Sequence, residues 1–330
     1  MSKKSKKHSK KKSTLKYKDV KDFLNNNLMY FSMLAFVLIS TTTLLTMKLV
    51  QPKELYQDSR VFSTKIYPPI PIIKDTASFP IISAQGALAV DLVTMMPLYE
   101  KNPDEKFLPA STTKIVTALV AMENYDNTDV FVVNGKRVSG QNMGLVTGEK
   151  ISVESLLEGL LIFSANDAAE VLAMNFPGGR DGFIAEMNKK ALEIGLMNSS
   201  FENPTGFDGG AHYTTSRDLI RVSIVAMDNP EFANIVSQKE KTVESVDKIY
   251  VHKLTNTNKL LGQDGVKGIK TGWTENAREN LVTYIEKDNK KIMIAILGSQ
   301  DRFGETKEVI DWIMNHYEWE DVVYEENNSY

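Results

Sequence analysis

The sequence predicts an α/β protein: an antiparallel sheet flanked by helices, a mostly helical subdomain, and an N-terminal transmembrane helix. Strand-like hairpins at both ends of the folded region predict the sheet. Helical periodicity between those ends predicts the subdomain, at about residues 135–230. A long uncharged stretch near the N-terminus predicts the transmembrane helix.

The N-terminal region combines a basic tail with an apolar segment. Residues 1–22 contain ten lysines and two aspartates, whereas residues 28–47 are twenty consecutive residues without a charge. An apolar helix of about 20 residues spans a bilayer, and lysine-rich flanks stay in the cytoplasm. No small-residue cleavage pattern follows, unlike in a secretory signal peptide. We therefore expect an uncleaved single-pass anchor at 28–47, a cytoplasmic tail at 1–27, and an extracytoplasmic remainder.

A linker is expected after the anchor. Four of the eleven prolines of the chain are Pro68, Pro69, Pro71 and Pro80, within residues 48–80, and proline favours extended conformations. The folded domain is expected at 81–318, followed by an acidic, frayed tail at 319–330.

Four segments of the folded domain read as strands. Residues 87–91 and 96–100 form one predicted hairpin. Residues 281–286 and 291–298 form a second, joined by a turn at Asp288-Asn289. Antiparallel hairpins at both ends of the domain predict one mixed layer of sheet and helices.

Helices are predicted from apolar spacing. The run at 111–122 follows Pro109-Ala110 and looks helical. In residues 153–161, apolar side chains recur at the i, i+3, i+4, i+7 and i+8 positions of an amphipathic helix. A last helix is expected at 309–317.

The composition excludes several classes of enzyme. The chain has no cysteine, which excludes a thiol nucleophile, a thiolate zinc site and an iron–sulfur cluster. Its four histidines lie far apart, and no glycine-rich phosphate loop occurs. We therefore expect no metal and no cofactor. The net charge of -3 is +8 in residues 1–22 and -11 in the remainder, and so dense a basic run would suit nucleic acid or an anionic membrane surface.

Three short motifs carry nucleophilic chemistry when taken together. They are Ser111-Thr-Thr-Lys114, Ser164-Ala-Asn166 and Lys270-Thr271-Gly272. The first recurs elsewhere by spacing alone, whereas the other two occur once each. Singly, each has a structural explanation as a helix cap, a solvated lysine or a strand end. Their combination, in this order, favours a catalytic interpretation.

The first motif supplies a nucleophile and a base. Ser111 and Lys114 lie three residues apart, on one face of the predicted helix. A serine hydroxyl needs a base, and a lysine serves only when deprotonated. Burial and a second nearby cation lower the pKa of a lysine, and Lys270 could be that cation.

The other two motifs supply the surroundings of the reaction. Ser164 offers a hydroxyl that can relay a proton, and Asn166 an amide that can hold a substrate carbonyl. Thr271 offers a hydroxyl to an anionic substrate group. Gly272 lets the backbone approach the ligand, and the next N–H, of Trp273, could join that of Ser111 in an oxyanion hole.

The residues around these motifs resemble the serine-type D-alanyl-D-alanine carboxypeptidases, the low-molecular-mass penicillin-binding proteins of the β-lactamase/transpeptidase-like superfamily. The resemblance covers roughly residues 80–318. Its matching segments are PASTTKIVTALVAME (109–123), SVESLLEGLLIFSANDAAEVLA (152–173), FENPTGFD (201–208), TTSRDLI (214–220) and GVKGIKTGWTENARENLV (265–282).

The resemblance implies a penicilloyl-serine-transferase fold and a set of roles. Ser111 would be the nucleophile and Lys114 the base, with Ser164 and Asn166 contributed by the helical subdomain. Lys270 and Thr271 would hold a terminal carboxylate, and Arg302 is a candidate to assist them. The implied substrates are peptidoglycan stem peptides ending in D-Ala–D-Ala, at a bacterial cell membrane, with β-lactams as covalent inhibitors.

Other functions remain open at this point. The same residues would serve an endopeptidase that cuts D-Ala crosslinks. A non-catalytic wall-binding or β-lactam-sensing protein would not need a base, which argues against it. A class A β-lactamase is disfavoured because no Glu-x-x-x-Asn segment follows Asn166. Nucleic acid is disfavoured as a partner of the lysine tail because the adjoining segment is apolar.

Overall fold

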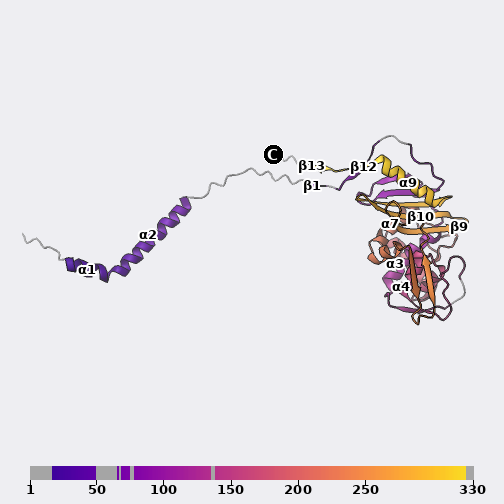
Figure 1. Cartoon of the computed structure of the whole chain (residues 1–330), viewed down its shortest axis with the longest axis horizontal. Helices are drawn as coiled ribbons and strands as arrows, with labels where there is room; N and C mark the ends of the chain where they lie inside the picture. Colours follow the sequence, from indigo (N-terminus) through magenta and orange to yellow (C-terminus); the bar gives the residue numbers. More distant parts are fainter. Residues whose placement is uncertain (1–16, 50–64, 67, 75–77, 135–137, 325–330) are drawn as a thin grey trace, which may run out of the picture. The chain divides into compact units, whose positions relative to one another are not determined.

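A computed structural model of the chain describes part of its length (Figure 1). The described residues are 17–49, 65–66, 68–74, 78–134 and 138–324. The chain divides into two units, one of Met1–Ser63 with Glu325–Tyr330, the other of Thr64–Tyr324.

The first unit contains two helices, α1 (Tyr17–Asn26) and α2 (Leu28–Leu49). The uncharged segment 28–47 lies within α2. Among the helices that the structure describes, none meets both the length and the apolarity needed to cross a membrane. The transmembrane helix therefore stays a prediction, and most of the basic tail lies outside the described residues.

The second unit is built on a five-stranded antiparallel sheet with the strand order β4-β3-β11-β10-β9. Both predicted hairpins are in this sheet, which confirms that part of the fold class. The central strand β11 is buried along most of its length because both faces of the sheet are covered. The strands are β3 (Gly86–Asp91), β4 (Pro97–Lys101), β9 (Val266–Thr274), β10 (Arg278–Lys287) and β11 (Lys290–Ser299).

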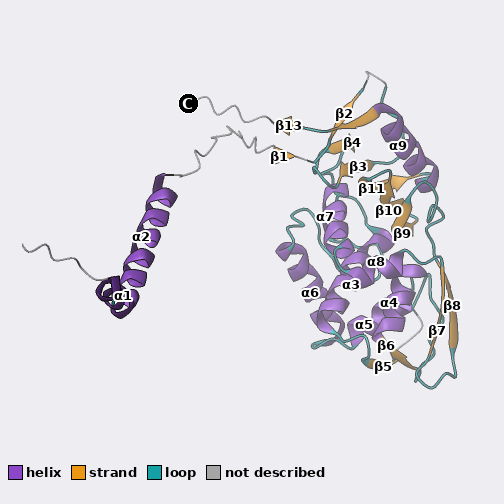
Figure 2. Cartoon of the chain, turned by 60° about the vertical axis from the view of Figure 1, so that its left-hand side comes forward, coloured by secondary structure: helices purple, strands orange, loops and turns teal. Residues whose placement is uncertain are grey.

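Helices cover the two faces of the sheet (Figure 2). One face packs against α9 (Arg302–His316) through a core that includes Ile294, Val309 and Trp312. The other face joins the core of the helical region through residues such as Leu88 and Leu297. The helices of that region are the 3₁₀ helix η1 (Ala110–Thr113), α3 (Lys114–Asn124), α4 (Val153–Ile162), α5 (Asn166–Met174), α6 (Gly179–Glu193), α7 (Ser216–Met227) and α8 (Pro230–Val236).

The helical region also contains two hairpins that the sequence reading did not predict. The first joins β5 (Val130–Val132) to β6 (Lys150–Ser152), and the second joins β7 (Glu240–Glu244) to β8 (Val251–Thr255). The amphipathic α4 begins where predicted, with Ser152 as its N-cap accepting a hydrogen bond from the backbone N–H of Ser155.

The compact unit extends beyond the expected range of 81–318. Within the predicted linker, β2 (Ile70–Ile73) pairs with β12 (Tyr317–Glu320), and β1 (Lys65–Ile66) pairs with β13 (Val323–Tyr324). The expected linker and frayed tail are therefore partly wrong. The reason is that Trp319, in the expected tail, donates a 2.9 Å hydrogen bond to Asp91 and so holds β12 against the sheet.

Candidate active site

A cavity of about 790 Å³ brings together residues from the three motifs. We call its two sides the helical wall (Ser111, Lys114, Ser164, Asn166) and the sheet wall (Lys270, Thr271, Gly272, Trp273, Arg302). All of these residues line the cavity except the two lysines, which are buried next to it with 0% and 1% of their surface exposed.

Ser111 lies in the short 3₁₀ helix η1, directly before α3. The segment leading to it is fixed by Asn280 of β10, whose amide donates hydrogen bonds to the carbonyls of Leu108 (2.9 Å) and Pro109 (3.0 Å). Strand β9 passes close by: a Cβ on Gly272 would lie 3.1 Å from the Ser111 nitrogen. Glycine at this position therefore lets the sheet wall approach the backbone of the serine.

Lys114 is the centre of the helical wall. Its Nζ lies 2.9 Å from Ser111 Oγ, 2.7 Å from Asn166 Oδ1 and 2.6 Å from the Thr205 carbonyl oxygen. A neutral amine has two N–H donors and one lone pair. The Asn166 Oδ1 and Thr205 carbonyl oxygens can only accept, so they take the two N–H groups of the neutral amine. Its lone pair then faces the Ser111 hydroxyl. This is the arrangement of a base about to take the serine proton.

The surroundings of Lys114 favour that neutral form. Burial, and then the positive charge of Lys270, hold the pKa of Lys114 well below its usual value. The carboxylates of Asp167 and Glu170 act in the opposite direction. After proton transfer, the ammonium would have three donors for the same three oxygens, so the partners of Lys114 can satisfy both protonation states.

Ser164 and Asn166 stand at the start of α5. Ser164 has a φ of 65°, in the left-handed region, and it lies in the turn that leads into the helix. The side chain of Asn166 bridges two parts of the chain, because its Oδ1 accepts from Lys114 and its Nδ2 donates to the Ser139 carbonyl at 2.9 Å. One N–H of the amide is left over for a substrate carbonyl.

The sheet wall gathers cationic and hydroxyl groups. Burial, and then the nearby Arg302, lower the pKa of Lys270 to about 7. The Thr271 hydroxyl lies 2.6 Å from that of Thr257, and Arg302 donates a 2.9 Å hydrogen bond to the Gly272 carbonyl. Trp273 is 62% exposed at the edge of the cavity. Two positive groups and a hydroxyl on one wall suit an anionic ligand.

Several residues that shape the site were missed by the sequence reading. Thr205 contributes a backbone carbonyl, which leaves no signal in the residue type. Asn203 holds the 205–207 turn, because its Oδ1 accepts from the backbone N–H groups of Thr205, Gly206 and Phe207. Both belong to the FENPTGFD segment, whose Asn-Pro and Thr-Gly pairs indicate a turn.

His212 has the hydrogen-bond partners of a buried, neutral histidine. The buried His212 accepts a hydrogen bond from the Glu202 backbone N–H at Nδ1, so its Nε2 donates to Thr113 and the ring is neutral. Burial lowers the pKa of His212 to about 4. Within the described ranges, no cluster of three His, Cys, Asp or Glu side chains could hold a metal ion.

Comparison with known proteins matches residues 73–301 to the family described as D-alanyl-D-alanine carboxypeptidase. The carboxypeptidase DacF of Bacillus subtilis is 32% identical over 71% of this chain and 63% of its own length. The D-alanyl-D-alanine carboxypeptidase of Streptomyces sp. K15 is 33% identical over 67% of this chain and 82% of its own. The chain thus spans less than two thirds of the length of DacF.

A solved structure agrees with these sequence matches. The crystal structure of the Streptomyces K15 DD-transpeptidase superimposes with a TM-score of 0.67 and 29% identity, over 72% of this chain and all of that one. This similarity shows that the second unit has the mixed α/β fold of the penicillin-binding proteins.

Proposed function

The chain belongs to the D-alanyl-D-alanine carboxypeptidase family, and from this premise we propose that it is a serine-type D-Ala–D-Ala carboxypeptidase. Its substrates would be peptidoglycan stem peptides, from which it removes the terminal D-alanine, and β-lactams would acylate the same serine. The observation that carries the proposal is the contact of buried Lys114 with Ser111 Oγ at 2.9 Å, opposite a cationic wall.

In the acylation step, Lys114 Nζ takes the proton of Ser111 while Oγ attacks the carbonyl carbon between the two D-alanines. The C–N bond of the tetrahedral intermediate then breaks, and a proton returned from Lys114, directly or through Ser164, leaves with the D-alanine amine. Water, activated by the same lysine, attacks the acyl carbonyl and releases the shortened peptide and Ser111. The step needs no metal or cofactor.

The sheet wall is proposed to select the substrate through its terminal carboxylate. Lys270, Thr271 and Arg302 offer donors of the kind that bind an anion tightly. Gly272 keeps β9 close to Ser111, so a carboxylate held there would bring the scissile carbonyl to the nucleophile. We further propose that the backbone N–H groups of Ser111 and Trp273 stabilise the oxyanion.

The test uses the full-length protein, a fluorescent penicillin and a pentapeptide ending in D-Ala–D-Ala. We expect covalent labelling of the wild type, release of D-alanine, and loss of both in Ser111→Ala, by about 1,000-fold or more as is usual when a nucleophile is removed. Labelling without release of D-alanine would instead identify a sensor. Labelling of the Ser111→Ala protein would show that the nucleophile is another residue.

Endopeptidase activity is a second candidate. The D-alanyl-D-alanine endopeptidase of Escherichia coli is 29% identical over 72% of this chain and 79% of its own length. A crosslinked peptide dimer and the linear pentapeptide, supplied at equal concentration, separate the two activities. A higher kcat/KM for the dimer would favour the endopeptidase.

We also propose that residues 28–47 anchor the enzyme in the bacterial cell membrane, with the N-terminus in the cytoplasm. The support is the uncharged length of this segment and the ten lysines that precede it. Protease added to intact cells should then degrade the region after residue 48 and spare the tail. Protection of the catalytic domain would contradict the orientation, and recovery in the soluble fraction would contradict the anchor.

A further inference from the structure

The position of Asn166 depends on the loop between β5 and β6, described here from residue 138 to 149. The Gln141 carbonyl of this loop accepts the backbone N–H of Asn166 at 2.7 Å, and the Ser139 carbonyl accepts its side-chain Nδ2 at 2.9 Å. Asn166 Oδ1 in turn accepts from Lys114. A shift of the β5–β6 loop would therefore move a hydrogen-bond partner of the catalytic base.

Apolar packing covers the β5–β6 loop incompletely. A cavity of about 460 Å³, separate from the active-site cavity, is lined by loop residues including Val138, Asn142 and Leu145. Polar contacts hold the loop as well, in addition to the packing of Met143 and Leu145 against the core of the helical region. The carboxylate of Asp167 accepts the backbone N–H groups of Met143 (3.1 Å), Gly144 (2.9 Å) and Leu145 (3.0 Å).

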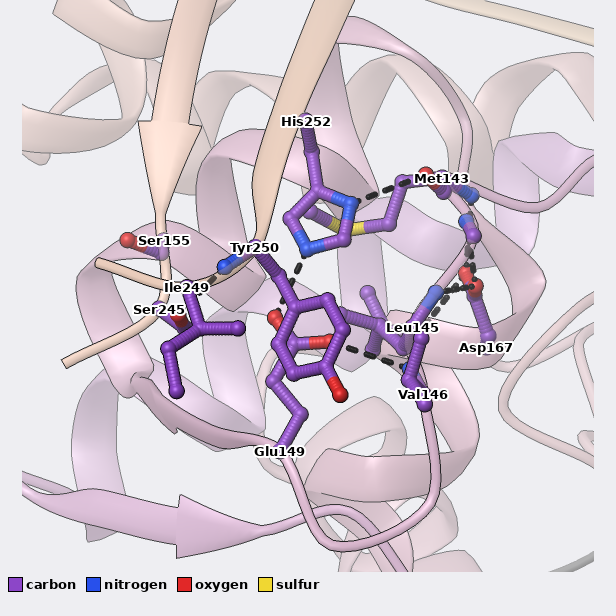
Figure 3. Close-up of polar contacts among 12 residues, drawn as sticks. Met143, Leu145, Val146, Glu149, Ser155, Asp167, Ser245, Ile249, Tyr250 and His252 are labelled. Atoms are coloured by element: carbon purple, nitrogen blue, oxygen red, sulfur yellow. Dashed lines mark hydrogen bonds and ion pairs between the residues drawn. The ribbon is translucent and has the colours of Figure 1, made fainter. Parts of the chain in front are cut away.

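A second polar anchor comes from the β7–β8 hairpin (Figure 3). His252, on β8, points into the loop: its Nδ1 lies 3.1 Å from the Met143 carbonyl oxygen and its Nε2 lies 2.7 Å from Glu149 Oε1. The other carboxylate oxygen of Glu149 accepts the Val146 N–H at 3.0 Å. The side chains of His252 and Glu149 are 6% and 0% exposed.

The partners of His252 determine how many protons the pair must hold. A carbonyl oxygen and a carboxylate oxygen both accept, so the two contacts need two donated protons, whereas a neutral imidazole has one. Either the ring is an imidazolium beside a carboxylate, or Glu149 is protonated and donates to the ring. His212 differs, since one of its partners is a donor, and its neutral ring is sufficient.

We propose that His252 and Glu149 are positioning residues of the active site. They form a buried ion pair, an imidazolium on a carboxylate, that fixes the β5–β6 loop and so aligns Asn166 with Lys114. The inference rests on the proposed function, because its effect is on acylation of Ser111. Neither residue lines the active-site cavity, so the pair acts on the reaction indirectly, through the β5–β6 loop and Asn166.

The experiment compares Glu149→Ala and Glu149→Gln in the full-length protein, by the acylation rate constant with fluorescent penicillin and by kcat and KM with the pentapeptide. Misplacement of a catalytic group can cost up to about 100-fold, so we expect Glu149→Ala to lose about 10- to 100-fold in the acylation rate constant and in kcat/KM. Glu149→Gln should stay close to wild type. Its amide can donate to a neutral His252 and still accept from Val146.

Glu158→Gln is the matched control, because Glu158 of α4 is also buried and forms an ion pair at 2.7 Å with the same hairpin, through Lys241 of β7. It should acylate like the wild type even where its melting temperature falls as far as that of Glu149→Ala. An equal loss of acylation in both variants would overturn the proposal, since hairpin stability would then explain the effect. Acylation of Glu149→Ala at the wild-type rate would also overturn it.

The ring protonation gives a measurement that does not depend on activity. In ¹⁵N spectra at neutral pH, the His252 ring of the wild type should show two protonated nitrogens, and that of Glu149→Gln one, with the signal assigned by its loss in His252→Ala. A neutral ring in the wild type would overturn the ion pair, even where Glu149→Ala fails to fold. Failure of the wild type itself to bind penicillin would instead contradict the proposed function.

Discussion

On the helical wall, Lys114 Nζ has three oxygen partners within 2.9 Å, whereas on the sheet wall Lys270 Nζ donates one bond, to the Thr271 carbonyl at 3.2 Å. Arg302 is similar to Lys270, since its buried Nε has no hydrogen-bond partner among the described residues. Buried donors without partners are costly. The difference is that protein oxygens satisfy the Lys114 amine, whereas the sheet wall has cationic donors with few protein partners, as the proposed binding of a substrate carboxylate requires.

The largest expected effect comes from removing the base. Lys114→Met should lower acylation by about 1,000-fold or more, within the range for loss of a general base, because it removes the side-chain amine that is hydrogen-bonded to Ser111 Oγ. Stopped-flow acylation by penicillin measures it. Thr117→Val is the matched control, since it removes a buried 2.7 Å hydrogen bond to the Pro204 carbonyl from the same helix without touching Ser111. Equal losses in both variants would mean that α3 stability, not proton transfer, is affected.

The sheet wall should show a different pattern of loss. Lys270→Met should reduce kcat/KM by about 10- to 100-fold for a peptide with a free C-terminal carboxylate, as expected for a hydrogen bond between charged groups. The same peptide with an amidated C-terminus should be affected several-fold less by the substitution. Equal losses for the two peptides would contradict the carboxylate role. Lys270 would then affect the reaction only through the effect of its charge on the pKa of Lys114, and not by binding the carboxylate.

The pH dependence separates the two lysines. Lys114 must be neutral to act, so activity falls at low pH. Lys270 must be charged to bind a carboxylate, and its pKa of about 7 in the free protein places a fall of kcat/KM above neutral pH. Because Arg302 contributes to lowering that pKa, Arg302→Gln should move the alkaline fall to higher pH. The amidated peptide should lack it. If the fall of kcat/KM at alkaline pH stays at the same pH in Arg302→Gln, a group other than Lys270 is responsible for it.

The sheet and the main helices could be predicted because each leaves a local pattern. Residues 281–286 and 291–298 are strand-like segments that flank a turn at Asp288-Asn289, and residues 153–161 have helical spacing. The pairing of β2 with β12 could not be predicted, since it joins segments far apart in the chain and is supported by tertiary contacts such as the hydrogen bond from Trp319 to Asp91. The β7–β8 hairpin was missed because its charged side chains obscure the alternation.

Residue types and motif order predicted which side chains form the candidate site. The structure places Ser111, Ser164 and Asn166 on one cavity, with Lys114 and Lys270 buried next to it, while their catalytic roles stay a prediction. The contacts that could not be predicted are those that do not depend on a recognisable residue type. They are the Thr205 carbonyl, the hydrogen bonds of Asn280 to the segment before Ser111, and the loop carbonyls that hold Asn166. The buried His252 was also missed, because a histidine far along the chain from every motif gives no sign of the loop it anchors until the hairpin is folded.

The smallest expected effect comes from removing a hydroxyl that supports Thr271 of the sheet wall. Thr257→Val removes the hydroxyl 2.6 Å from Thr271 Oγ1 and keeps the branched shape. A neutral hydrogen bond contributes about 0.5–1.5 kcal/mol, so KM for the carboxylate peptide should rise about two- to tenfold. Acylation at saturating substrate should not change, because the helical wall is untouched. A fall in kcat with KM constant would show that Thr257 acts on the chemical step. It would contradict the proposal that the sheet wall serves substrate binding and the helical wall serves proton transfer.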